Sequence, residues 1–244
     1  MAHLKDRHVL VIGGSSGIGL ATARLAMEDG AHVTITGRDT DKLNRAAVAL
    51  GGAEAIQLDL ADEAGIAALF DGRSVDHVGI TGPGPGFYPF TEADIEQVRA
   101  DFDAKFWGQY RIARQAVARL VETASGGSDA SLTFMSGAFS QRPIPGASTL
   151  AAIQSGLEGL ARALAVEVGP VRVNAVSPGL TDTPLIRGLF GDGTDDLYAD
   201  TARGLPAQRV AQPEDIAETF VMLMRNRSMT GSTIYPDGGL TLRG

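Results

Sequence analysis

Short apolar runs rich in Val and Ile alternate along this chain with longer stretches of helical periodicity. We expect seven of these runs to be β-strands, at residues 8–12, 31–36, 55–58, 75–80, 131–136, 171–176 and 233–235. We expect six helices between and after them, at residues 18–29, 41–50, 63–70, 93–122, 148–168 and 213–224. The runs are apolar throughout, which is typical of strands that helices cover on both faces. The pattern predicts an α/β fold with a doubly wound parallel sheet of about seven strands, flanked by helices.

The composition is that of one folded domain. The 244 residues are 44% hydrophobic, and no Pro/Ser-rich linker or charge run divides them. We therefore expect a single domain over residues 1–244. The stretch 184–205 is acidic and holds glycines, and it follows a strand end, where sheets of this kind bind ligands. A mobile lid and a solvated surface excursion both fit this stretch.

Charge and cysteine content exclude several classes of function. A net charge of −8 disfavours binding to nucleic acid or to an anionic membrane surface. The chain has no Cys and four scattered His, so we expect no disulfide and no metal site. The N-terminal residues are typical of neither a signal peptide nor a membrane span. We expect a cytoplasmic protein.

A glycine-rich turn follows the first strand run. Gly13, Gly17 and Gly19 have the spacing Gly-x-x-x-Gly-x-Gly and directly precede an apolar helical stretch. Such glycines permit the tight turn, the approach of backbone to a pyrophosphate, and close packing of helix on strand. The free N–H groups at the start of the helix favour negative charge. The turn predicts a dinucleotide-binding Rossmann fold with cofactor contacts at Gly13, Ser15, Ser16, Gly17, Ile18 and Gly19.

The end of the second strand run bears on the choice of cofactor. An NAD-selective site usually places an acidic side chain there, but this chain has Gly37 followed by Arg38. A guanidinium at that point can bind a 2′-phosphate through two parallel hydrogen bonds, which favours NADP(H). The neighbouring Asp39 can instead accept hydrogen bonds from a ribose, so NAD(H) stays possible.

Over nearly its whole length the sequence resembles the short-chain dehydrogenase/reductase family. Four segments carry the resemblance: Gly13–Gly19, Leu58–Leu60, Arg172–Gly179 and Tyr235–Gly239. The resemblance implies that Asp59 contacts adenine and that Pro178, Gly179 and Thr183 border the nicotinamide. Further cofactor contacts are expected at Gly37, Arg38, Leu60, Gly82 and Gln154.

The positions that transfer the proton in this family hold other residues here. The resemblance aligns the family's Tyr with Leu150 and its Lys with Gln154, in Gly146-Ala-Ser-Thr-Leu-Ala-Ala-Ile-Gln154. It aligns the family's Ser with Gly137, and the Asn of the preceding long helix with Lys105. A leucine has no proton to donate, and general acid catalysis contributes roughly 10²–10⁴-fold to a rate. The usual mechanism is therefore expected to be absent.

Three residues are candidates to replace the missing groups. Lys105 can act as an acid, a base or a Schiff-base nucleophile when desolvated, or it can supply only the positive charge of the missing Lys. Ser136 can polarise a carbonyl or bond only to backbone. Gln154 can hydrogen-bond a ribose but carries no charge. Tyr88 is the one tyrosine expected to face the pocket, and it is a weaker candidate for the acid.

The stretch 148–168 is apolar or small-chained on most of its circumference, so two sides of this helix are expected to be covered. One side packs on the sheet. The resemblance implies that the other meets a second copy of the chain, together with the helix 93–122 and its residues Phe106, Trp107 and Tyr110. We expect a homodimer or homotetramer.

Three functions fit these observations. The first is an NADP(H)-dependent oxidoreductase that acts on a carbonyl or alcohol by a non-standard proton-transfer route. The second is a non-redox enzyme, an isomerase, cyclase or lyase, that uses the same pocket. The third is a non-catalytic nucleotide-binding regulator or a partner subunit. The sequence does not identify the substrate, which we expect to be a small molecule.

Overall fold

A computed structural model describes residues 4–82, 84 and 86–242 of the chain. Its sheet is parallel and has the strand order β3-β2-β1-β4-β5-β6-β7. The strands are β1 (His8–Ile12), β2 (His32–Gly37), β3 (Glu54–Gln57), β4 (His77–Ile80), β5 (Ser131–Met135), β6 (Arg172–Val176) and β7 (Thr233–Ile234). The order reverses between β1 and β4, and in such sheets ligands bind outside the carboxyl ends of the strands at that point. The predicted seven-stranded, doubly wound, single-domain fold is confirmed.

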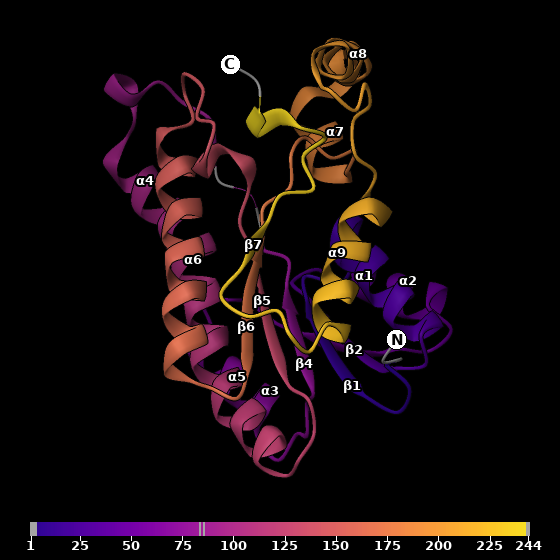
Figure 1. Ribbon diagram of the computed structural model, residues 1–244. Coiled ribbons are helices and arrows are strands. Elements are labelled where there is room, and N and C mark those ends of the chain that lie inside the picture. Colours follow the sequence, from indigo (N-terminus) through magenta and orange to yellow (C-terminus); the bar gives the residue numbers. More distant parts are fainter. Residues whose placement is uncertain (1–3, 83, 85, 243–244) are drawn as a thin grey trace.

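Helices cover both faces of this sheet (Figure 1). One layer holds α3 (Glu63–Phe70), α4 (Ile95–Asp101), α5 (Gly108–Ser125) and α6 (Ser148–Glu167), and the other holds α1 (Gly17–Glu28), α2 (Thr40–Ala49) and α9 (Pro213–Arg225). Two further helices, α7 (Pro184–Phe190) and α8 (Thr194–Gly204), lie above the carboxyl ends of the strands. Side-chain carboxylates cap the N-termini of three helices: Asp39 caps α2, Asp62 caps α3 and Asp94 caps α4.

Alternate side chains of the strands enter two separate cores. Leu10 and Ile12 of β1 pack in the layer of α3, α5 and α6, whereas Val9 and Val11 pack in the layer of α1, α2 and α9. All four are at most 1% exposed. This double burial explains why the strand sequences are apolar throughout. The edge strand β3 departs from that expectation because its four residues are exposed or half-buried.

The helix predicted over residues 93–122 is interrupted, so that prediction was wrong in detail. A π-helical segment, Phe102–Trp107, separates α4 from α5. It is a wide i→i+5 turn, and its buried residue is Lys105. Apolar periodicity does not mark such a turn, because the pattern on either side stays helical. Turns of this kind often occur at functional sites.

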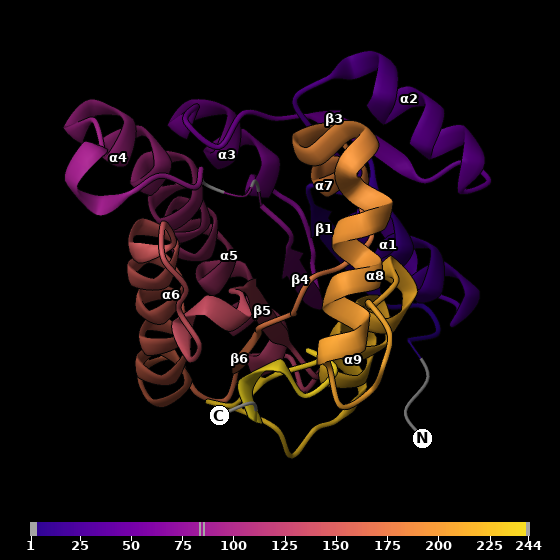
Figure 2. The ribbon, with the colours of Figure 1, turned by 90° about the horizontal axis from the view of Figure 1, so that it is seen from above.

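The stretch 184–205 is also more ordered than its sequence indicates. It forms α7, a short 3₁₀ turn (Gly191–Gly193) and α8. Thr183 caps α7 by accepting a hydrogen bond from the Ile186 backbone N–H, and Pro184 occupies the first turn. Seen from above, α8 lies over α9 (Figure 2). In the part of the chain that the structure describes, no helix combines the length and apolarity needed to cross a bilayer.

Candidate active site

The glycine-rich turn is shaped as a close-packed cradle at the carboxyl end of β1. Gly13 and Gly17 have φ of +86° and +52°, which favours glycine at both positions. A Cβ on Gly13 would lie 2.0 Å from the carbonyl oxygen of Thr81, and one on Gly19 would lie 2.2 Å from the carbonyl oxygen of Gly13. Only glycine fits these two positions. The missing side chains therefore let the turn pack tightly against Thr81 and let the start of α1 pack against the turn.

The start of α1 is free to bind an anion. Ser16 precedes the helix in extended conformation, and its side chain makes no capping hydrogen bond. The first turn of α1 holds no acidic residue. Its N–H groups therefore keep their capacity to donate to a ligand, and the helix dipole favours negative charge at this end. Gly17 faces the Thr183 side chain, so the turn and the start of α7 lie next to one another. These features fit a dinucleotide.

At the end of β2, the residues implicated in cofactor choice play different roles. The Asp39 carboxylate accepts the Lys42 backbone N–H at 2.9 Å and lies 3.8 Å from the Lys42 ammonium. Its backbone hydrogen bond with Lys42 lowers the pKa of this carboxyl. The Arg38 side chain is exposed, while its backbone carbonyl accepts from Gln57. Gly37 lies against the Ser15 side chain, which brings the glycine-rich turn next to Arg38.

The other predicted cofactor residues follow successive strands at the same edge of the sheet. Asp59 is exposed, and one of its oxygens accepts the Ala61 backbone N–H at 3.0 Å. Gly179 packs closely against Asp237, and Thr183 is buried as the cap of α7. Leu60 follows β3, Gly82 follows β4, and Pro178 follows β6. The sequence thus identified a set of residues that the fold does bring to one edge.

Lys105, in the π-helical segment before α5, is buried against the end of β5. The side chain is 5% exposed, and its Nζ lies 3.4 Å from the carbonyl oxygen of Ser136. Burial lowers the pKa of this ammonium to about 8, and no carboxylate counteracts that effect within the described residues. An amine in this position can hold or release a proton near neutral pH.

Gln154 and Gly137 fit together. A Cβ on Gly137 would lie 2.2 Å from Gln154 Nε2, so the amide fills the space that a side chain at position 137 would take. Gln154 is 4% exposed, and its Oε1 has no hydrogen-bond partner among the described residues. An unpaired buried oxygen is costly unless a ligand supplies a donor. Gln154 and Lys105 thus reach the segment Ser136–Gly137 from two different helices.

Sequence reasoning missed Glu158, which is 2% exposed on α6. The carboxylate accepts hydrogen bonds from Ser136 Oγ at 2.9 Å, Ser140 Oγ at 2.5 Å, Gln141 Nε2 at 3.4 Å and Tyr235 OH at 3.1 Å. The Ser136 hydroxyl is also 3.1 Å from the Gln154 carbonyl oxygen. This hydroxyl is therefore engaged within the protein. The only available signal was the spacing of Glu158, one helical turn beyond Gln154.

The remaining candidates lie around these residues. Leu150 is buried in the first turn of α6 and offers no donor. The Tyr88 hydroxyl donates to the Asp101 carboxylate at 2.8 Å, and burial raises the pKa of this tyrosine. In this arrangement Tyr88 is a poor proton donor to a substrate. No cluster of metal-ligating side chains occurs in the described parts of the chain.

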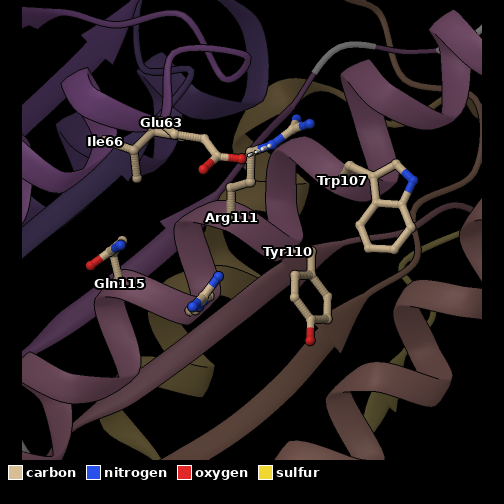
Figure 3. A pocket seen from close by; sticks show the side chains of 7 residues that line it. Glu63, Ile66, Trp107, Tyr110, Arg111 and Gln115 are labelled. Carbon is tan, nitrogen blue, oxygen red and sulfur yellow. Dashed lines mark ion pairs between the residues drawn. The ribbon is translucent and has the colours of Figure 1, made fainter.

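A separate cavity lies outside this site, between α3 and α5 (Figure 3). It has a volume of about 230 Å³, and Trp107 and Tyr110 form one side of it. Arg111 pairs there with Asp103 at 2.6 Å and lies 3.5 Å from Glu63. None of the predicted cofactor or proton-transfer residues lines this cavity.

Comparison with known proteins agrees with this geometry. A family model described as enoyl-(acyl carrier protein) reductase matches residues 13–241. A solved short-chain dehydrogenase/reductase family protein has 36% identity and a TM-score of 0.89, covering 99% of this chain and all of the other.

Two named relatives are similar over nearly their full length. MalC, a short-chain dehydrogenase/reductase of Malbranchea aurantiaca, is 30% identical over 98% of this chain and 96% of its own. Its structure, described as a reductase/Diels-Alderase, has a TM-score of 0.85 at 29% identity and covers 98% of both chains. The NADP-dependent (R)-specific alcohol dehydrogenase of Lentilactobacillus kefiri is 32% identical over 98% of each chain. The chain belongs to the short-chain dehydrogenase/reductase family.

Proposed function

We propose that this chain is an NADP(H)-dependent oxidoreductase of a carbonyl or alcohol substrate, and that its proton transfer does not use position 150. The observation that carries the proposal is the pair formed by Lys105 and Gln154 at the segment Ser136–Gly137. Both are buried, and neither has its hydrogen-bonding capacity filled among the described residues. Buried groups in that state favour a ligand that completes them.

The preference for NADP(H) rests on the different roles of Asp39 and Arg38 at the end of β2. Asp39 caps α2 through one carboxylate oxygen, which ties this acidic group to the start of the helix and weakens the case for NAD(H). Arg38 is exposed beside the glycine-rich turn and can bind a 2′-phosphate. The relative from Lentilactobacillus kefiri, whose name states NADP dependence, supports the same choice.

The cofactor residues carried over from the family are part of the same proposal. The turn Gly13–Gly19 and the start of α1 would hold the pyrophosphate, and Asp59 the adenine. Gly82, Pro178, Gly179 and Thr183 would border the nicotinamide. When bound, the reduced nicotinamide supplies a hydride. The chain must then position the carbonyl and balance the charge that develops on its oxygen.

We assign these tasks to Lys105 and Gln154. Relative to the family pattern, two groups have changed places. The family has an amide (Asn) where this chain has Lys105, and an amine (Lys) where this chain has Gln154. The site therefore keeps one amine and one amide, with their helices exchanged. Lys105 Nζ holds the proton and the positive charge, and Gln154 Oε1 accepts from a hydroxyl of the ribose. Ser136 acts by anchoring the segment to Glu158, because its hydroxyl is already engaged.

The test is turnover of Lys105 variants, followed by nicotinamide absorbance over a panel of ketones and aldehydes. Lys105→Met is expected to lower kcat at least 100-fold, and Lys105→Arg to retain nucleotide binding but lose the proton supply. For the wild type, the rate of reduction should fall as the pH rises through about 8, because the ammonium then loses its proton. Unchanged kcat in Lys105→Met would exclude Lys105 as the donor.

A second candidate function is a non-redox reaction, such as a cyclisation, isomerisation or elimination. Leu150 gives the site an apolar side chain where the family has its acid, and MalC, described as a reductase/Diels-Alderase, has the same fold. Tight NADPH binding without nicotinamide oxidation over the whole panel would favour this candidate, or the regulatory one.

We further propose that the chain forms a homodimer or homotetramer through α5 and α6. Phe106, Trp107 and Tyr110 form an aromatic cluster there, and Phe106 packs against Gly156 of α6. Trp107 is 47% exposed, which is unusual for so large an apolar surface unless it is covered. Light scattering should give a multiple of 25.4 kDa.

A further inference from the structure

Two exposed histidines lie side by side at the amino ends of adjacent strands. His8 begins β1 and His32 begins β2, and these two residues are direct partners in the parallel pairing of the strands. Directly paired residues of neighbouring strands point to the same face of a sheet. The centres of the two imidazole rings are 5.2 Å apart, and the ring planes are inclined at 36°. Within the described residues neither imidazole makes a hydrogen bond, so their ring nitrogens are available to a ligand.

The separation of the two rings is that of imidazoles that share one metal ion. Imidazole nitrogens bind Zn²⁺ at about 2.0–2.1 Å in tetrahedral geometry, which places the centres of two rings on one ion roughly 5 Å apart. The observed 5.2 Å agrees with this value. Because both residues are exposed, each ring can turn about its side-chain bonds and point a nitrogen at the ion without a movement of the strands.

The charged groups next to the pair do not oppose a cation strongly. Glu54, which begins β3, binds the Arg73 guanidinium at 2.6 Å. The hydrogen bond from Arg73 lowers the pKa of the Glu54 carboxyl, with a smaller contribution from the charge of His8. Asp76 accepts the His8 backbone N–H at 2.8 Å and binds the Arg7 guanidinium at 3.0 Å. Each of these two arginines is therefore matched by a carboxylate.

We propose that His8 and His32 form a binding site for one divalent transition metal ion of the kind that prefers imidazole, such as Zn²⁺. The described residues contain no group of three metal-ligating side chains, so two protein ligands hold the ion and water completes its coordination. The sequence indicates no such site, because 24 residues separate the two histidines and only the pairing of β1 with β2 brings them together.

This site is separate from the candidate active site. His8 begins β1 and the glycine-rich turn follows its end, and a strand of five residues is about 17 Å long. The starts of β1 and β2 lie at the opposite edge of the sheet from α7 and α8 (Figure 1). A bound ion joins the two strands in the folded chain, whereas the unfolded chain does not hold the two imidazoles together. The inference is therefore independent of the proposed function.

Titration with zinc chloride, followed by isothermal calorimetry, tests the proposal in the full chain. The starting protein carries His3→Gln, so that the one histidine outside the described residues cannot supply a ligand. One equivalent of Zn²⁺ is expected to bind, and the ring signals of His8 and His32 should shift together in NMR spectra. His8→Gln and His32→Gln should each weaken binding at least tenfold, because one imidazole then remains. His77→Asn, which removes a buried imidazole, is the matched control and should keep the affinity.

Saturating Zn²⁺ should also raise the urea midpoint of unfolding of the starting protein and leave that of His8→Gln and His32→Gln unchanged. These unfolding curves show at the same time that both variants fold. Absence of binding at about 1 mM Zn²⁺ would overturn the inference. Two equivalents per chain, one of them lost in each variant, would show that each imidazole binds its own ion. Full affinity in either variant would show adventitious binding at the surface, and both of these results also overturn the inference.

Discussion

At the scale of single residues, the site is defined by side chains that fit one another rather than by any one group. Gln154 occupies the space above Gly137, so each residue at this pair limits the other. A larger side chain at position 137 alone would displace Gln154 from its buried position. The residues at positions 137 and 154 are therefore physically coupled.

This coupling can be measured in a double-mutant cycle. Gly137→Ala should lower the free energy of unfolding by about 1–3 kcal/mol, because the new methyl group forces the buried amide to move. In the background Gln154→Ala the same change should cost less than about 1 kcal/mol, giving a clear coupling energy. Denaturant unfolding of the four proteins checks this. Additive effects would show that the two side chains do not share this space.

The sequence predicts some of these residues and not others, for physical reasons. Gly13 and Gly19 are predictable because a tight backbone turn before a helix imposes its requirement locally. The contact of Gly137 with Gln154 joins residues on separate elements, and no local pattern reports it. The role of Glu158 could not be predicted for the same reason, since all four of its hydrogen-bond partners lie outside α6.

At the scale of elements, Glu158 ties three segments together: the end of β5, the 3₁₀ turn Ala138–Ser140 and the residue after β7. These segments include or adjoin Ser136–Gly137, which Lys105 and Gln154 both contact. A buried carboxylate whose partners are mostly hydroxyls positions them without a neutralising cation.

Glu158→Ala is expected to lower the free energy of unfolding by roughly 2–4 kcal/mol, because it leaves several buried donors unpaired. Glu158→Gln keeps an acceptor and should lose about half as much. Glu167→Ala, at an exposed position of the same helix, is the control and should lie within about 0.5 kcal/mol of the wild type. Unfolding in urea measures all three. A loss in Glu158→Ala no larger than in the control would remove Glu158 from this role.

Secondary-structure elements were predicted correctly where a strand is buried on both faces of the sheet, because its residues are then apolar throughout. They were missed where such burial is absent. The strands at the centre of the sheet can be predicted from the sequence because every residue of β4, β5 and β6 is buried. The π-helical segment around Lys105 has no signature of its own. Helix α7 was not predicted because it has no buried residue, so its apolar positions do not report a core-facing side.

At the scale of the whole molecule, stability should depend on pH through a residue far from the site. His77 starts β4, is 1% exposed and lies 2.9 Å from Ser131 Oγ. Burial lowers the pKa of this imidazole from 6.5 to about 4; Asp129 opposes this effect with a smaller contribution, and Arg172 adds to it. Between these values the unfolded chain binds the proton and the folded chain does not.

Stability should therefore fall as the pH is lowered from 6.5 to 4, by up to roughly 3 kcal/mol from this group. His77→Asn keeps a polar atom for Ser131 and should lose most of that slope. The exposed His32 is the control, and His32→Gln should keep it. Urea unfolding at several pH values gives the slope. An unchanged slope in His77→Asn would place the pH dependence elsewhere.

The central claim is that the fold binds a dinucleotide at the end of β1 and selects NADP(H) through Arg38, with Asp39 withdrawn as the cap of α2. The most direct measurement is the ratio of the dissociation constants of NADH and NADPH for the wild-type protein, from fluorescence titration. The account predicts that NADPH binds at least tenfold more tightly, and that Arg38→Ala brings the ratio close to one. Failure to bind either nucleotide, or tighter binding of NADH, would contradict it.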